Sequence, residues 1–382
     1  MKFALFSAQY LPTIGGVERY THYLAQALTH AGHEVTIIAS QLPDTPISEN
    51  EDAVKIVRVP SIPMLAGRYP LPRFNRNFRS LMKDIAVGNF DLALINTRFW
   101  ALSLWAARAC AKRGIPCIVL EHGSSYLTMG NYALNTIIRI YEHIAAWWMK
   151  RYASKFAAVS QQSASWLKTF AINDVEILYN AININQTVKQ AAQGAWNVRD
   201  DFSIPASMKL IAFVGRLLPE KGIPELLEAM RVTQLTVPEC VLIIAGEGPL
   251  HSQLEAHNQA GVIYVGGLTH ERALSLLSQA DIFCLPSHSE GFSTVVLEAG
   301  ALGTFMVTTP VGGTPELILS KEYGGILPAH NEQTIAELLI EALTNDRWRH
   351  SAANKTRARV ESTFTWDQTA QALISIAREL VD

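Results

Sequence analysis

The sequence predicts an α/β protein of two domains, and three observations support this prediction. The chain has 382 residues, which fits two domains because a typical domain has about 100–200 residues. Apolar residues make up 49% of the chain and charged residues 17%, so each domain can bury a core. Short apolar runs alternate with longer amphipathic segments from one end to the other, which is typical of layered α/β folds.

Ten apolar runs are predicted to be strands. They lack the alternation of a half-buried strand, so we expect them in parallel sheets that helices cover on both faces. Five lie in the first half of the chain, at residues 3–6, 35–39, 93–95, 117–120 and 156–159. Five lie in the second half, at residues 210–214, 241–245, 262–265, 282–285 and 305–308.

Amphipathic segments between these runs are predicted to be helices, and the main ones are residues 17–31, 98–113, 224–234, 249–259, 295–302 and 366–381. The pattern pauses in a polar stretch at residues 180–205. We therefore expect one domain at residues 1–185 and another at 205–365, with helix 366–382 crossing back to the first. Two such domains would enclose a cleft, with the site at the carboxyl ends of the strands.

Composition and charge exclude several classes of protein. The four cysteines (Cys110, Cys117, Cys240, Cys284) form no CxxC pair, so they indicate neither a zinc nor a redox site and fit a reducing cytosol. No apolar run reaches the length of about 18 residues that spans a bilayer. The apolar run at the start of the chain is too short for a secretion signal, so we expect a cytoplasmic protein. The first 200 residues carry 20 Lys and Arg against 13 Asp and Glu, and the remainder 12 against 21. Either the first half meets an anionic surface, or the split is incidental.

The first glycine signal is Gly15-Gly16, between the first strand and the first helix. Two glycines there let backbone N–H groups approach an anion at the helix N-terminus. The alternative is a plain turn. This is not the GxGxxG fingerprint, and no acidic residue ends the second strand, so a nicotinamide cofactor is not expected.

Two further signals follow strands of the second domain. Arg216 and Lys221 come directly after strand 210–214, and two cations in one loop suit a diphosphate, although a solvated turn paired with Glu220 is the alternative. After strand 282–285, Gly291 allows a tight turn, and Ser293 or Thr294 can cap the next helix, whose first N–H groups would then point at the cleft.

Two carboxylates bracket that helix start. Glu290 precedes it, and Glu298 lies about one turn inside it, so both can accept hydrogen bonds from hydroxyl groups. Taken singly, Glu290 could be an ordinary loop residue and Glu298 a charge that stabilises the helix dipole. Together they indicate a site for a sugar joined through a diphosphate to a ribose.

Four ordered segments of this chain, GGVERY, VGRLLPEKG, AGEGP and EGFSTVVLEA, resemble the motifs of retaining glycosyltransferases of family 4. The resemblance covers nearly the whole length. It implies a GT-B architecture, in which two Rossmann-like domains with parallel sheets face a central cleft. It also implies a nucleotide-sugar-dependent hexosyltransferase of the glycosyl transferases group 1 type.

The resemblance also implies roles for individual residues. Gly16 would lie beside the donor phosphates, which Arg216 and Lys221 would clamp, Glu298 would hold the ribose and Glu290 the donor sugar. The remaining implied donor contacts are the backbone of Phe292, Ser293 and Thr294, and the turn ending at Leu268, which would face the base. His122 stands where the family has its active-site histidine, and its place at a strand end before Gly123 favours that role over a satisfied core histidine.

The sequence departs from the family at two places. Ser293 stands where Gly is more usual, and Asn180-Ala181 stands where the family has Asn-Gly. No DxD-like metal motif is present, so neither a metal nor another cofactor is expected. Cations and helix dipoles would stabilise the leaving diphosphate instead.

Two basic–aromatic clusters lie in the first domain. One, at residues 68–83, contains Arg68, Tyr69, Arg73, Phe74, Arg76, Phe78, Arg79 and Lys83. The other, at residues 141–152, contains Tyr141, Trp147, Trp148, Lys150, Arg151 and Tyr152. They suit an anionic lipid surface, here the inner face of the cytoplasmic membrane, whereas no motif supports nucleic-acid binding; a partly buried helix with a basic edge is the alternative.

We therefore expect a retaining transferase that moves a sugar from a nucleotide-diphosphate donor to a glycan or lipid-linked acceptor in cell-envelope assembly. Two other classes stay open. One is another enzyme on the same fold, a nucleotide-sugar epimerase or a glycogen-synthase-like polymerase. The other is a non-catalytic nucleotide-binding protein.

Overall fold

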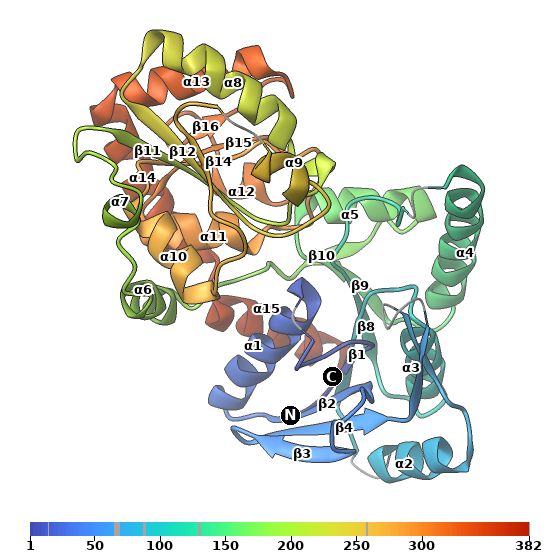
Figure 1. Ribbon diagram of the computed structural model, residues 1–382. Coiled ribbons are helices and arrows are strands. Elements are labelled where there is room, and N and C mark those ends of the chain that lie inside the picture. Colours follow the sequence, from blue (N-terminus) through green and yellow to red (C-terminus); the bar gives the residue numbers. More distant parts are fainter. Residues whose placement is uncertain (14, 65–68, 87–88, 129–130, 257–258, 382) are drawn as a thin grey trace. The chain divides into compact units, whose positions relative to one another are not determined.

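The computed structural model describes residues 1–13, 15–64, 69–86, 89–128, 131–256 and 259–381, and the chain divides into two units. The first unit consists of Met1–Asn180 and Trp366–Asp382, and the second of Ala181–Thr365. Each unit is built on a sheet covered by helices (Figure 1). The predicted α/β fold is confirmed.

The first unit contains an eight-stranded sheet in the order β10-β9-β8-β7-β1-β2-β4-β3, in which only β3 is antiparallel. Its strands are β1 (Lys2–Ser7), β2 (Glu34–Ser40), β3 (Ser48–Glu51), β4 (Val54–Val59), β7 (Leu92–Asn96), β8 (Cys117–Glu121), β9 (Lys155–Ala158) and β10 (Val175–Ile177). The five predicted strands fall on β1, β2, β7, β8 and β9. Every residue of β7 and β8 is buried, as expected for central parallel strands.

Sequence reasoning missed the outer strands of this sheet and a small hairpin. β4 pairs in parallel with β2, β3 covers β4, and β5 (Ser61–Met64) pairs with β6 (Tyr69–Pro72). β3 and β5 are largely exposed, and prolines interrupt both strands of the hairpin. They therefore lack the continuous apolar run that marks a central strand.

Helices flank the first sheet, and they are α1 (Gly16–His30), α2 (Arg76–Ala86), α3 (Ala101–Ala111), α4 (Tyr132–Lys150), α5 (Gln161–Leu167), η1 (Lys168–Phe170) and α15 (Trp366–Val381). The last helix belongs to this unit because Trp366 packs between two rings of α1. Its ring centroid lies 5.2 Å from that of Tyr20 and 5.7 Å from that of Tyr23. Figure 1 shows α1 in blue beside α15 in red.

The second unit contains a six-stranded parallel sheet in the order β13-β12-β11-β14-β15-β16. Its strands are β11 (Lys209–Val214), β12 (Cys240–Ala245), β13 (Val262–Tyr264), β14 (Ile282–Leu285), β15 (Phe305–Thr308) and β16 (Gly325–Ile326). All five predicted strands of the second half are present. The two-residue β16 is too short to stand out in the sequence.

The helices of the second unit are α6 (Ile184–Gln193), α7 (Val198–Asp201), η2 (Pro219–Lys221), α8 (Ile223–Thr236), α9 (His251–Glu255), α10 (His270–Gln279), α11 (Thr294–Leu302), α12 (Thr314–Leu317), α13 (Glu332–Thr344) and α14 (Asp346–Thr363). The helix predicted at 249–259 is shorter in the structure, and residues 257–258 of that prediction lie outside the described residues.

The polar stretch at 186–204, predicted as a linker, belongs instead to the second unit. It contains most of α6 and all of α7. Trp196 and Val198 are buried in the core of that unit, and the hydroxyl of Ser275 donates to the carbonyl oxygen of Trp196. The sequence pattern fails here because a few apolar side chains without a helical period, Trp196, Val198 and Ile204 among them, attach this segment.

In both sheets the strand order reverses direction at one point. The chain starts in the middle of each sheet, adds strands on one side, and then returns to add the others. The switch falls between β1 and β7 in the first unit and between β11 and β14 in the second. Ligands of open α/β sheets bind at the carboxyl ends of strands beside such a switch. Among the described helices, none is long and apolar enough to cross a bilayer.

Candidate functional site

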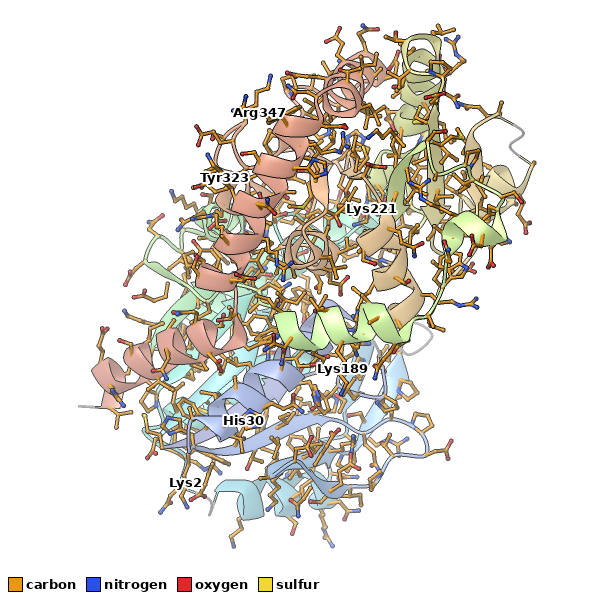
Figure 2. The ribbon with its side chains drawn as sticks, turned by 90° about the vertical axis from the view of Figure 1, so that its left-hand side faces the viewer. Lys2, His30, Lys189, Lys221, Tyr323 and Arg347 are labelled. Carbon is orange, nitrogen blue, oxygen red and sulfur yellow. The ribbon has the colours of Figure 1, made fainter. Side chains whose placement is uncertain are left out.

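In the second unit, the structure brings together two predicted residues from separate motifs. Lys221 follows β11 and Glu290 follows β14, the two strands at the switch. The ammonium group of Lys221 donates to Oε1 of Glu290 over 2.5 Å, and the hydroxyl of Ser287 donates to the same oxygen over 2.9 Å. Both charged side chains are less than 15% exposed. Figure 2 labels Lys221 within this unit.

A glycine lets these two loops approach each other. Gly222 has a φ of +71°, and a Cβ there would lie 2.2 Å from the carbonyl oxygen of Pro286. The backbone N–H of His288 also donates to the carbonyl oxygen of Glu220 over 2.8 Å. The loop after β11 is therefore fixed to the loop after β14. The alternative in which Lys221 pairs with Glu220 is wrong, because its partner is Glu290.

Arg216 differs from Lys221 in its surroundings. It is exposed just beyond the end of β11, and in the part of the chain that the structure describes its guanidinium group has no ion-pair partner. The edge of the sheet at the switch therefore presents one paired cation and one cation that is free to meet an anion. Such a pair of cations can bind a diphosphate.

The loop before α11 is held from two sides. The backbone N–H of Gly313 donates to the carbonyl oxygen of Gly291 over 3.0 Å, and a Cβ on Gly313 would lie 2.3 Å from the ring of Phe292. The Phe292 side chain is buried edge-on to Phe364, with ring centroids 5.2 Å apart. Only the backbone of Phe292 is therefore suited to the predicted ligand contact.

Helix α11 begins at Thr294, with Ser293 at the N-cap position. The predicted capping role of the Ser293 hydroxyl is wrong, because within the described residues it accepts no hydrogen bond from the first turn. A helix start without a side-chain cap retains the positive end of its dipole for an anion.

Glu298 has a partner that sequence reasoning missed. Its side chain is only 9% exposed, and Nε2 of His270 lies 2.8 Å from its Oε1. His270 is the first residue of α10, and the Thr269 hydroxyl caps that helix by accepting from the N–H of Arg272. Leu268, predicted to face the base, ends the preceding turn and packs partly against the core. The sequence offered one signal for this contact, because Thr269 and His270 stand directly before an amphipathic segment.

In the first unit, Gly15 and Gly16 stand at the start of α1 as predicted, and a carboxylate lies beside them. A Cβ on Gly15 would lie 2.3 Å from Oε2 of Glu18. Glu18 is buried, and burial raises its pKa above the ordinary range. The sequence contains Glu18 within GGVERY, but its approach to Gly15 depends on the three-dimensional turn.

His122 follows β8 and is largely enclosed by its neighbours, with only part of the residue exposed. Its Nε2 lies 2.7 Å from Oδ1 of Asn96, the last residue of β7, and its ring lies edge-on to Tyr20 at 4.9 Å. Burial lowers the pKa of His122 to about 3, so the ring is neutral. One ring nitrogen of His122 thus has a hydrogen-bond partner in Asn96. The residue also lies at the carboxyl end of β8, where a ligand would bind.

A buried ion-pair cluster adjoins His122 through Glu121, which accepts a hydrogen bond from the His122 backbone N–H. Arg98 forms ion pairs with Glu121 and Glu142, and all three side chains are at most 3% exposed. The Arg98 guanidinium group also stacks on Phe170, 4.1 Å from the ring centroid. Sequence reasoning missed this cluster, although a charged residue within each of three apolar segments was a visible signal.

The two basic–aromatic clusters divide into buried and exposed residues. Tyr141, Trp148 and Phe78 turn inward: Tyr141 and Trp148 donate to the carbonyl oxygens of Phe99 and Leu104, and Phe78 is buried. Cations and rings that are exposed include Arg73, Phe74, Arg76, Arg79, Lys83, Trp147, Lys150 and Arg151. Arg68 lies outside the described residues.

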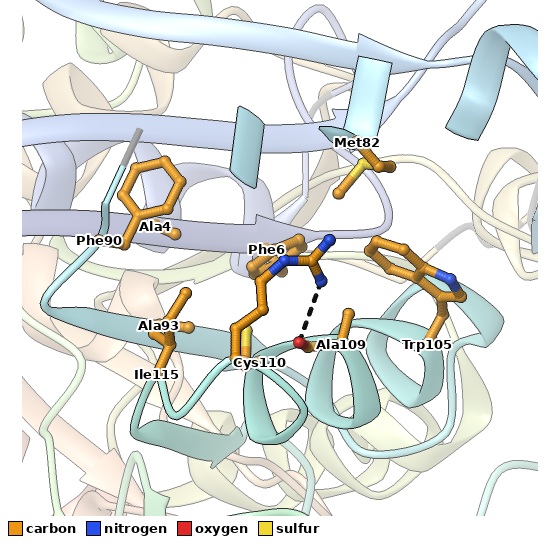
Figure 3. A pocket seen from close by; sticks show the side chains of 10 residues that line it. Ala4, Phe6, Met82, Phe90, Ala93, Trp105, Ala109, Cys110 and Ile115 are labelled. Atoms are coloured by element: carbon orange, nitrogen blue, oxygen red, sulfur yellow. Dashed lines mark hydrogen bonds between the residues drawn. The ribbon is translucent and has the colours of Figure 1, made fainter. Parts of the chain in front are cut away.

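A small apolar pocket in the first unit is a poor candidate for the site. Phe6, Met82, Trp105 and Cys110 line it, and the Arg113 guanidinium group at its side donates to the carbonyl oxygen of Ala109 (Figure 3). The pocket lies between helix α3 and the face of the sheet at β1 and β7, not at the carboxyl ends of the strands where a ligand is expected. Within the described ranges, no cluster of three His, Cys, Asp or Glu side chains could hold a metal ion.

Comparison with known proteins adds a family to this geometry. Residues 195–359 match the family model for glycosyl transferases group 1, and residues 14–186 match the model for glycosyltransferase family 4. A putative teichuronic acid biosynthesis glycosyltransferase, TuaC of Bacillus subtilis, is 30% identical over 73% of this chain and 69% of its own. The glycogen synthase of Mycobacterium tuberculosis is 25% identical over 98% of this chain and 94% of its own.

Solved structures share the fold at lower identity. Sucrose-phosphate synthase from Thermosynechococcus elongatus has a TM-score of 0.75 and 20% identity, covering 99% of this chain and 98% of its own. Anabaena HepE in complex with UDP has a TM-score of 0.73 and 18% identity, covering 99% of this chain and 100% of its own. These similarities establish the GT-B fold.

Proposed function

Because this chain belongs to the group 1 glycosyltransferases, we propose that it transfers a hexosyl group from a nucleotide-diphosphate sugar to a glycan or lipid-linked acceptor. We further propose retention at the anomeric carbon, no requirement for a metal, and a place in cell-envelope assembly. The observation that carries this proposal is the Lys221–Glu290 pair at the switch of the second sheet.

Charge explains why this pair suits a nucleotide-diphosphate sugar. Lys221 and Glu290 neutralise each other in a site with little exposure. An incoming diphosphate attracts Lys221 and Arg216, and Glu290 then becomes an acceptor for sugar hydroxyl groups. Glu298, oriented by His270, is suited to the two hydroxyl groups of a ribose. One set of side chains thus serves the phosphates, and two carboxylates serve the polyols on either side.

The same groups would act in the reaction. As the bond from the anomeric carbon to the diphosphate breaks, negative charge grows on the leaving oxygens. Lys221 and Arg216 stabilise that charge more in the transition state than in the bound donor. The leaving phosphate, on the same face as the acceptor, takes the acceptor's proton, which gives retention without an enzymic nucleophile. HepE is described in complex with UDP and with UDP-glucose, so a uridine donor is the first to test.

The donor site is tested by thermal unfolding of the full chain with UDP, GDP or ADP, each with and without EDTA. A diphosphate at a hundred times its dissociation constant should add about 2.7 kcal/mol of stability. Lys221→Ala should abolish that shift and lower donor turnover at least about tenfold, while Lys355→Ala, which removes an exposed lysine of the same unit, should change neither. Absence of a shift with every diphosphate, or full turnover by Lys221→Ala, contradicts the proposal. Loss of activity with EDTA contradicts metal independence.

An exposed face of α4 supports docking on an anionic membrane. Ile137, Ile140, Ile144 and Trp147 recur at helical spacing, and each side chain is more than half exposed. The only carboxylate on this helix, Glu142, is buried against Arg98, whereas Arg139 and Lys150 are exposed. An apolar stripe flanked only by cations fits lipid tails and anionic headgroups. Figure 1 shows α4 at the edge of the first unit.

Vesicle sedimentation tests this docking surface. The full chain should pellet with vesicles of phosphatidylglycerol at low salt and remain in solution with phosphatidylcholine. Replacing both Ile140 and Ile144 by Glu should abolish pelleting, because two charges would enter the apolar layer. Leu235→Glu, at an even more exposed apolar residue of α8, is the control and should still pellet. Equal pelleting of all three proteins, or of none, contradicts the surface.

A further inference from the structure

The ring of His122 is held by a residue that the proposed function leaves without a role. Asn96 ends β7, next to the strand that precedes His122, and its side chain is 1% exposed. Its Oδ1 lies 2.7 Å from Nε2 of His122. Asn96 stands at the carboxyl end of a strand beside the switch of the first sheet, so it is placed to act on a ligand site through its neighbour.

The other contacts of Asn96 fix which way its amide group points. Its amino group donates to the carbonyl oxygen of Phe6 and to the hydroxyl of Thr21, each over 3.2 Å. A carbonyl oxygen can only accept, so the amino group must face Phe6. Thr21 gives its own proton to the carbonyl oxygen of Val17 over 2.7 Å, so it also accepts from Asn96. The amide oxygen is therefore the atom that faces His122.

This orientation determines the tautomer of the histidine. An amide oxygen cannot donate, so Nε2 of His122 must carry the hydrogen. Burial disfavours a second proton on the ring. The neighbouring groups do not supply a negative charge that would favour this second proton. Tyr20 is a buried phenol, and the Glu121 carboxylate is paired with the Arg98 guanidinium group. Nδ1 is thus a lone-pair acceptor, and among the described residues it has no hydrogen-bond partner.

The backbone at His122 is fixed as well. Oε1 of Glu121 accepts hydrogen bonds from the N–H groups of His122, over 3.2 Å, and Gly123, over 3.0 Å. Its other oxygen is paired with Arg98, so the carboxylate cannot swing away. Side chain and backbone of His122 are consequently positioned by two separate buried groups.

We propose that Asn96 is a positioning residue that fixes His122 as the neutral Nε2–H tautomer, so that Nδ1 accepts a hydrogen bond from a hydroxyl group of the substrate. This inference rests on the proposed function for the identity of that hydroxyl group, which belongs to a sugar. His122 in this state is an acceptor and cannot donate a proton from Nδ1. It therefore selects a hydroxyl group at that position over a carbonyl or phosphate oxygen.

The tautomer can be read without any substrate. In the full chain labelled with ¹⁵N-histidine, long-range ¹H–¹⁵N NMR spectra distinguish a protonated ring nitrogen from an unprotonated one, and His122→Phe assigns the signals. We expect a protonated Nε2 and an unprotonated Nδ1 in the unmodified protein at pH 7. Asn96→Ala should mix the tautomers, while Asn50→Ala, which removes an exposed amide of the same unit, should leave them unchanged. A protonated Nδ1 in the unmodified protein overturns the proposal, whatever the activity.

Kinetics then test whether the position matters. Asn96→Ala should lower kcat by about tenfold, the worth of one hydrogen bond in the transition state, with the Kd for the nucleotide unchanged. The double variant with His122→Ala should lose no more than His122→Ala alone, because Asn96 acts through that ring. Additive losses overturn the positioning role.

Two further results keep the tests separate. If Asn96→Ala does not fold, the spectrum of the unmodified protein still decides, because a protonated Nδ1 or a mixture of tautomers there overturns the proposal. If the NMR result is as expected but no sugar is transferred, the proposed function fails while the assignment of the tautomer stands.

Discussion

Replacing Arg98 by Met should destabilise the first unit strongly, and more at high pH than at low pH. The substitution removes the cation that is paired with the buried carboxylates of both Glu121 and Glu142. Removing one partner of a buried ion pair costs about 3–5 kcal/mol, because a charge is left in a medium that solvates it poorly. Met fills a similar volume, so a cavity does not explain the effect.

The pH dependence follows from the pKa of Glu142. Burial raises it above the ordinary value of 4.5, although the N–H of Leu127 and Arg98 both act in the opposite direction. A carboxyl group with a raised pKa in the folded state adds most stability below its unfolded pKa, and that stability is lost as the pH rises through the folded pKa. Without Arg98 the pKa rises further, and each unit costs about 1.4 kcal/mol at high pH. The loss should therefore be full at pH 8 and smaller at pH 5.

Thermal unfolding followed by circular dichroism checks this prediction. The first unit comprises Met1–Asn180 and Trp366–Asp382, and in domains of that size 1 kcal/mol shifts Tm by about 2–4 °C, so a fall of about 6–20 °C is expected at pH 8. Arg79→Met, at an exposed arginine of α2, is the control and should shift Tm little. An unchanged Tm for Arg98→Met at pH 8, or a larger loss at pH 5 than at pH 8, would refute the reasoning.

Three other substitutions test the site. Gly222→Ala should lower the stability of the second unit by about 1–3 kcal/mol and weaken nucleotide binding, whereas Gly266→Ala, with the same φ of +71° and open space around it, should cost less in a urea titration. His270→Ala should weaken UDP binding by about tenfold in calorimetry, because Glu298 loses its hydrogen-bond donor; an unchanged Kd would show that His270 does not orient it. Burial raises the pKa of Glu18, so ionisation of its carboxyl group above that pKa destabilises the fold. The difference in stability between Glu18→Gln and the unmodified protein should therefore shift in favour of Glu18→Gln when the pH is raised from 4.5 to 8. The exposed Glu34→Gln should show no such difference, and equal behaviour of the two variants would contradict the burial argument.

Much of the fold could be predicted because the central strands are buried on both faces. Such strands need continuous apolar runs, and residues 282–285 and 305–308 coincide with β14 and β15. The edge strand β3 and the hairpin strand β5 carry no such run, because most of their residues are exposed to water. The segment at 186–204 looked like a linker because isolated side chains, Trp196 among them, attach it to the core.

The sequence by itself determined the α/β class, the loops after β11 and β14, and the residue types that suit a sugar diphosphate. Local order and spacing are enough for these, since a strand end, a glycine and a nearby cation are neighbours in the chain. Only the tertiary structure decided that Lys221 meets Glu290, that His270 meets Glu298 and that Asn96 holds His122. These partners lie between 26 and 69 residues apart, and the parallel order of the strands brings their carboxyl ends to one edge of each sheet.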